Sequence, residues 1–168
     1  LLVPSLSLLS SKLKINYVPV QLMIVPALCI GLDVQFLKYI LSFERPASIL
    51  TDEIIFLEPI FIAGSFPSGH AATVLSVILI WLSFALNDLK SKESKIIFSF
   101  FVLIALSVAL SRVIIGAHWF SDILGSLALV LMAIAIFNIN FIKAFFEKSI
   151  FFKYFSFMLI GLSWVGIL

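Results

Sequence analysis

Residues 96–115 read IIFSFFVLIALSVALSRVII, and this stretch carries a single charged side chain, that of Arg112. A helix needs about 20 mostly apolar residues to cross the hydrocarbon core of a bilayer. The apolar residues here follow one another without the alternation of a barrel strand, which favours a helix over a strand. The stretch therefore predicts a membrane-spanning helix.

Four further runs have a similar length and composition. They are Val18–Leu37, which can extend to Phe43, Ala71–Leu86, Trp119–Phe137, and Ile150–Leu168, which Lys153 interrupts. The opening run, Leu1–Ser10, is too short to span alone and looks like the end of a helix whose beginning is absent, so we expect a truncated N-terminus. Together the runs predict an all-α fold: a polytopic transmembrane helical bundle of about five to six spanning helices in a single domain over residues 1–168.

The composition excludes several other classes of protein. The 168 residues are 62% hydrophobic and 12% charged, with a mean hydropathy of +1.23, which is far more apolar than a soluble or disordered chain. One cysteine, Cys29, cannot form a disulfide framework or a cysteine-rich metal site. A net charge of +2 is too small to indicate nucleic acid as a partner.

The basic residues predict how the chain is oriented in the membrane. Most of the 11 lie in connections 11–14, 88–95 and 138–153, which fall on one side if the helices alternate in direction. That side is then cytoplasmic, because short cytoplasmic loops are rich in Lys and Arg. The remaining three, Lys38, Arg45 and Arg112, belong to the opposite, outer face, together with the 44–69 loop.

Both histidines, His70 and His118, also belong to this outer face. Any one of the three cations could simply extend to the interface from a helix end. Five ionisable groups that gather on one face of an apolar protein are better explained by a functional site.

His118 and Asp122 are spaced i and i+4 at the start of a predicted helix, so they lie one turn apart on one face. A carboxylate placed there can fix the imidazole tautomer and leave the other ring nitrogen as a nucleophile. The simpler alternative is an acidic residue favoured by the helix dipole, which does not account for the register with His118.

The segment Pro67-Ser68-Gly69-His70 ends the outer loop and begins a helix. Ser68 can cap that helix, and Gly69 allows a ligand to approach backbone N–H groups that favour anions. The alternative is an ordinary turn and cap. Cations, free N–H groups and imidazoles together suit a phosphate. Two histidines without a cluster of carboxylates make a poor metal site, so we predict no metal and no cofactor.

These residues form three signatures. The first is Lys38, six residues, then Arg45-Pro46; the second is Pro67-Ser68-Gly69-His70. The third is Ser111-Arg112, five residues, His118, three residues and Asp122. In these signatures the chain resembles the type-2 phosphatidic acid phosphatase superfamily, also called the lipid phosphate phosphatases, in its bacterial membrane branch. The resemblance extends over roughly residues 33–131, and the signature region itself is 38–122.

The resemblance implies a role for each matching residue. His118 would be the nucleophile that forms a phosphohistidine, Asp122 would orient and activate it, and His70 would protonate the leaving group. Lys38, Arg45 and Arg112 would bind the phosphate oxygens, together with Ser68 and the Gly69 backbone. The resemblance also implies six spanning helices, a site near the outer face and no requirement for a metal ion. A helix over 150–168 would be an addition to that pattern.

We therefore expect a lipid phosphatase in the bacterial inner (plasma) membrane, with its active site on the periplasmic face. Undecaprenyl diphosphate, phosphatidic acid, phosphatidylglycerol phosphate and the phosphates of lipid A all remain candidate substrates. Two alternatives from other classes stay open. One is an intramembrane serine protease that uses Ser65 or Ser68 with His118, and the other is a non-catalytic lipid transporter or scaffold.

Overall fold

The computed structural model describes residues 20–50, 63–85 and 92–165, and helices are the only regular elements in these ranges. The all-α prediction is confirmed. The elements are α2 (Val20–Leu41), α3 (Pro46–Ile49), α4 (Gly69–Ala85), α5 (Lys92–Ile114), α6 (Phe120–Phe137), α7 (Asn140–Lys148) and α8 (Ile150–Val165).

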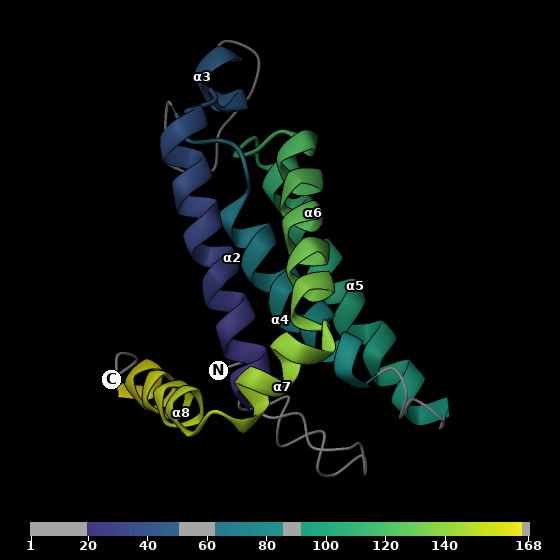
Figure 1. Cartoon of the computed structure of the whole chain (residues 1–168). Helices are drawn as coiled ribbons and strands as arrows, with labels where there is room; N and C mark the ends of the chain where they lie inside the picture. Colours follow the sequence, from purple (N-terminus) through teal and green to yellow (C-terminus); the bar gives the residue numbers. More distant parts are fainter. Residues whose placement is uncertain (1–19, 51–62, 86–91, 166–168) are drawn as a thin grey trace.

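Four of these helices run side by side along the long axis of the molecule (Figure 1). Helix α4 lies in the middle and packs against α2, α5 and α6. The short helix α3 lies beyond the upper end of this bundle, and α7 and α8 lie at the lower end (Figure 1). The end of α2, the start of α4, the end of α5 and the start of α6 therefore meet at the upper end.

Small and branched apolar residues allow the helices to pack closely. Ala71 on α4 and Ala105 and Ala109 on α5 are each at most 1% exposed and bring the two backbones together. Lower in the bundle, Trp81 is completely buried, and its ring lies 4.4 Å from that of Phe98, centroid to centroid. This core fixes the relative positions of the helix ends above it.

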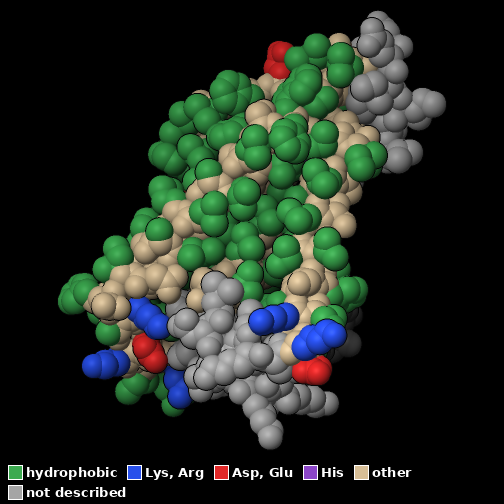
Figure 2. Space-filling view, turned by 90° about the vertical axis from the view of Figure 1, so that its right-hand side faces the viewer, with side chains coloured by type: hydrophobic (Ala, Val, Ile, Leu, Met, Phe, Trp, Pro, Cys, Tyr) green, Lys and Arg blue, Asp and Glu red, His purple; other side chains and the backbone are tan. Residues whose placement is uncertain are grey.

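The outside of the bundle is apolar. Large hydrophobic side chains are exposed along its helices, such as Leu32 at 72% and Leu103 at 62%. Figure 2 shows hydrophobic side chains over the middle of one face and Lys, Arg, Asp and Glu gathered mostly at the lower end. An apolar band with charges at its end is the surface expected of a protein that lies in a bilayer.

Several of the predicted spans fall within the described residues. In that part of the chain three segments are long and apolar enough to cross a membrane, namely Gln21–Ile49, Lys95–Ile114 and Phe120–Phe137. Helix α4 has 17 described residues and runs alongside them, while the rest of the predicted span, Leu86, lies outside the described residues, as does Leu1–Ser10.

The possible extra span at 150–168 stays a prediction. Its described part, α8, has 16 residues, which gives a length of about 24 Å, and the last three residues lie outside the described ones. Helix α8 lies across the lower end of the bundle rather than along it (Figure 1). The apolar composition of this stretch could not reveal its direction, which depends on the turn at Ser149 and on packing against α2.

Candidate active site

Two cations are attached to the loop that leads into α4. Lys38, in the last turn of α2, donates from Nζ to the Gly64 carbonyl at 2.8 Å. Arg45, which precedes α3, reaches the carbonyls of Ala63, Gly64 and Ala117 at 3.3–3.5 Å. Gly64 has φ +72°, a left-handed conformation that glycine adopts without steric cost. This turn lets one carbonyl oxygen serve both cations and hold them side by side.

A second glycine connects Arg112 to His118. Helix α5 ends at Ile114, and Gly116 has φ +72°, so the chain reverses there. The N–H groups of Ala117 and His118 then both donate to the Arg112 carbonyl, at 3.1 and 3.0 Å. The tight turn places the imidazole directly above the helix end that carries the guanidinium.

Asp122 lies in the first turn of α6 and is 2% exposed. Its Oδ2 is 3.2 Å from His118 Nδ1 and accepts hydrogen bonds from the Trp119 N–H at 2.9 Å and the Ser65 hydroxyl at 2.5 Å. Because an ionised carboxylate can only accept a hydrogen bond, this contact favours the tautomer in which His118 Nδ1 carries the proton. His118 Nε2 is then the nitrogen left for a ligand.

Ser68 belongs to the structural support of the site. It is completely buried, and its Oγ accepts the Ala71 N–H at 3.4 Å, as expected of a residue that caps α4. Its own N–H donates to the Asp122 carbonyl at 3.3 Å, and the Ser126 hydroxyl bonds both the Ser68 and Asp122 carbonyls. These bonds fasten the start of α4 to the start of α6.

The predicted site residues meet around one cavity of about 910 Å³. Six of the eight line it: Lys38, Arg45, Gly69, His70, Arg112 and His118. The other two, Ser68 and Asp122, lie behind its wall in the contacts described above. A direct bond from Ser68 to a phosphate stays a prediction. The site lies at the end of the bundle opposite to Lys92 and Lys95, with which α5 begins.

This end of the cavity suits an anion. Three cations from α2, the loop before α3 and α5 face the same space as two imidazoles. A phosphate spreads its charge over several oxygens, and guanidinium groups match that geometry with paired N–H donors. Within the described ranges, no three His, Cys, Asp or Glu side chains lie close enough together to hold a metal ion.

Ser65 was not among the predicted contacts of the carboxylate. The sequence suggested it only as a protease nucleophile, yet its hydroxyl donates to Asp122. A pairing between residues 57 positions apart has no local signal in one sequence. The one signal in the sequence is position: Ser65 lies two residues before Pro67, which begins the second signature.

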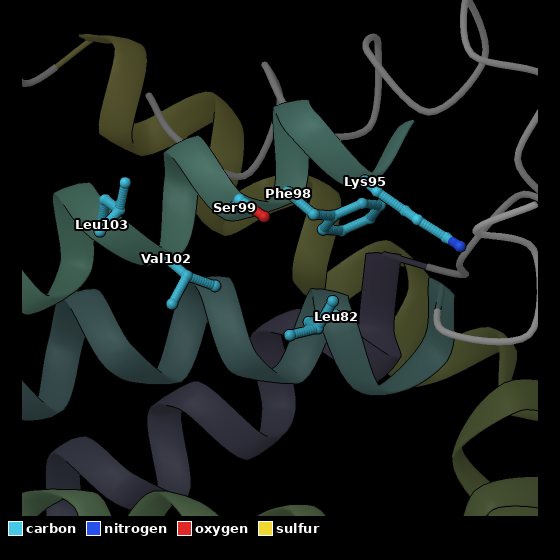
Figure 3. Close-up of a pocket in the computed structure, with 6 residues that line it drawn as sticks. All are labelled: Leu82, Lys95, Phe98, Ser99, Val102 and Leu103. Atoms are coloured by element: carbon cyan, nitrogen blue, oxygen red, sulfur yellow. The ribbon is translucent and has the colours of Figure 1, made fainter. Parts of the chain in front are cut away.

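A second cavity, of about 540 Å³, lies between α4 and α5 towards the start of α5. Figure 3 shows its lining: Leu82, Lys95, Phe98, Ser99, Val102 and Leu103. Among the described residues, Lys95 is the single ionisable one that lines this apolar cavity. It offers one charge and no nucleophile–base pair, so we assign the chemistry to the larger cavity.

Comparison with known proteins identifies the family of the chain. A segment of 87 residues, 50% of the chain, is 39% identical to phosphatidylglycerophosphatase B of Bacillus subtilis (strain 168). The segment spans 40% of that relative, so the chain matches less than half of the relative's length. No solved structure matches the chain. The profile of the PAP2 superfamily matches residues 17–148, a range that includes all three signatures, and the chain therefore belongs to the PAP2 superfamily.

Proposed function

We propose that this protein is a membrane phosphatase that hydrolyses a phosphate monoester or diphosphate on a lipid through a phosphohistidine intermediate. One observation carries the proposal. A buried His118–Asp122 pair lies at the wall of a cavity that has three cations at one end and apolar helix faces at the other. A lipid phosphate has two matching parts, because its charged headgroup is joined to a hydrocarbon chain.

The first step is transfer of the phosphoryl group to the protein. His118 Nε2 attacks phosphorus, the bond from phosphorus to the lipid oxygen breaks, and His70 donates a proton to that oxygen. Asp122 accepts the Nδ1 proton of His118 in a hydrogen bond, which stabilises the positive charge that the ring acquires.

The second step returns the protein to its starting state. A water molecule attacks phosphorus, the phosphorus–nitrogen bond to His118 breaks, and phosphate leaves. His70, which gave its proton to the lipid oxygen in the first step, now takes a proton from this water. Throughout, Lys38, Arg45 and Arg112 bind the equatorial oxygens, and Gly69 allows its backbone N–H to approach them.

The cavity and the relative both support a proposal for the substrate class. The relative's name states a phosphatidylglycerol phosphate substrate for that protein. We propose the same class here, with phosphatidic acid, undecaprenyl diphosphate and lipid A phosphates as the panel to compare. We further propose that residues 1–168 act as one domain in the bacterial inner membrane, with the site on the periplasmic face.

The serine hydroxyls do not support the protease alternative. Ser65 Oγ donates to Asp122, and Ser68 Oγ accepts the Ala71 N–H, so each is already engaged away from His118. A transporter or scaffold would need the cations but has no use for a buried histidine–aspartate pair.

Phosphate release from the lipid panel tests the proposal, with purified protein in mixed micelles. The wild type should release inorganic phosphate from at least one lipid, and His118→Ala should release none while it still inserts into membranes. Substantial turnover by His118→Ala would contradict the mechanism. Peptide cleavage, or lipid transfer without released phosphate, would instead favour one of the alternatives.

A further inference from the structure

The large cavity continues well beyond the charged groups. Apart from Gln35 close to Lys38, the walls below the cations are mainly apolar faces of α2, α4 and α5, formed by residues such as Ala27, Ile30, Val34, Val77 and Val108. Among the described residues that line this lower part of the cavity, none is ionisable. The walls therefore favour a hydrocarbon occupant that is joined to the anion bound above.

Helix geometry gives the depth of this lower part. The lining residues of α2 include positions 27, 31, 34 and 38, which form one stripe on one face. Gly31 lies seven residues before Lys38 and is thus about 10 Å deeper, and Ala27 is about 16 Å deeper. Helix α4 runs in the opposite direction, so Ser76, seven residues after Gly69, lies at about the depth of Gly31.

The polar residues of α4 in this wall are satisfied within their own helix. The Thr73 hydroxyl donates to the Gly69 carbonyl at 2.9 Å, and the Ser76 hydroxyl donates to the Thr73 carbonyl at 2.8 Å. Since both donors are used, this wall offers an incoming chain methyl and methylene surface rather than groups that need a polar partner.

Gly31 is where the cavity can be narrowed most simply. A Cβ atom added there meets no heavy atom within 4 Å, whereas a Cβ at Gly69, beside the cations, meets Val34 at 3.8 Å. A side chain at position 31 would occupy the open space without displacing a neighbour.

We propose that the groove between α2 and α4 holds a hydrocarbon chain of the lipid phosphate, and that the absence of a side chain at Gly31 lets chains pass deeper than this position, about 10 Å along α2 from Lys38. This inference rests on the proposed function. It makes Gly31 a specificity-determining position for chain length, because a large side chain there would narrow the lower groove.

The test compares long and short chains in the same enzyme. Gly31→Leu and Gly31→Phe are assayed with dipalmitoyl and dihexanoyl phosphatidic acid in mixed micelles, and with the chainless ester p-nitrophenyl phosphate. Relative to wild type, kcat/KM for the dipalmitoyl lipid should fall at least tenfold, and further for Phe than for Leu. The values for dihexanoyl lipid and p-nitrophenyl phosphate should stay within twofold.

Gly161→Phe is the matched control, because Gly161 on α8 also has no heavy atom within 4 Å of an added Cβ and lies outside the groove. It should leave the dipalmitoyl-to-dihexanoyl ratio unchanged. The inference is overturned if both Gly31 variants retain the wild-type ratio, or if both lose all three substrates equally. Failure of the wild type to release phosphate from these substrates and from every other lipid of the panel would instead contradict the proposed function, whatever the Gly31 variants do.

Discussion

At the scale of single residues, the site depends on one carboxylate oxygen. Asp122 Oδ2 accepts hydrogen bonds from the Ser65 hydroxyl, the Trp119 N–H and His118 Nδ1. The donors come from the loop before α4 and from the turn between α5 and α6, so this oxygen joins segments that are distant in the sequence. Because Asp122 is almost fully buried, the loss of any one donor would also weaken the hold of the carboxylate on the His118 imidazole.

Ser65→Ala should lower kcat by about tenfold to a hundredfold, since a hydrogen bond to a charged group contributes about 1.5–3 kcal/mol. Ser126→Ala is the control, because Ser126 is equally buried and donates to two backbone carbonyls, not to the carboxylate. Steady-state phosphate release and thermal unfolding would be measured for both. Equal losses of activity in the two variants would show that Ser65 has no special role towards Asp122.

Arg112→Lys keeps the charge but removes the paired N–H donors of the guanidinium. We expect a loss of about a hundredfold in kcat/KM, in the range seen when one donor to a developing oxyanion is removed. Lys153→Arg, an exchange on α8 far from the site, should leave the rate unchanged. Activity near wild type in Arg112→Lys would mean that charge alone binds the phosphate.

At the scale of elements, the site is assembled by the ends of helices and by close packing between them. Gly125 on α6 is three residues after Asp122, and a Cβ there would lie 2.2 Å from the Phe66 ring. The ring can therefore lie against α6 only because position 125 is glycine. This contact positions the loop that contains Gly64 and Ser65.

Gly125→Ala should displace Phe66 and lower both stability and turnover, with an overpacking cost of about 1–3 kcal/mol. Gly161→Ala, where an added Cβ has no close neighbour, should lose neither. The double variant Gly125→Ala with Phe66→Leu should recover part of the activity, because a smaller side chain relieves the contact. Thermal unfolding and phosphate release check the prediction, and an unaffected Gly125→Ala variant would refute the role of this contact.

At the scale of the whole molecule, charge is divided between two ends. The three cations that line the large cavity lie at the upper end, and Lys92, Lys95, Lys143 and Lys148 belong to α5 and α7 at the lower end. Helix α7 combines three phenylalanines with Lys143, Glu147 and Lys148 and buries none of its residues, as expected of a helix at a membrane surface. From the positive-inside rule we predict that the lower end is cytoplasmic.

Cysteine labelling tests this orientation in intact cells. In a Cys29→Ser background, which removes the single native cysteine, Glu44→Cys adds an exposed thiol at the upper end and Lys148→Cys adds one at the lower end. A membrane-impermeant maleimide should label Glu44→Cys alone until the membrane is permeabilised. The reverse pattern would place the site in the cytoplasm.

The sequence predicted the helices, the end of the bundle where the site lies, and the cluster of Lys38, Arg45, Arg112 and His118, because hydropathy and motif spacing are local properties. It did not predict the direction of α8, which has the composition of a span but lies across the bundle (Figure 1). It also missed the bond from Ser65 to Asp122 and the contact between Phe66 and Gly125. Those depend on tertiary packing, which leaves no periodic pattern in one chain.

The most direct test of the central claim is to trap the covalent intermediate. Purified protein is mixed with a lipid whose terminal phosphate carries 32P, quenched in denaturant within milliseconds, and digested to locate the label. The account predicts a label on His118 that survives alkali and is lost in acid, with none in His118→Ala. A label that persists in His118→Ala, or one that is stable to acid and attached to a serine, would contradict it.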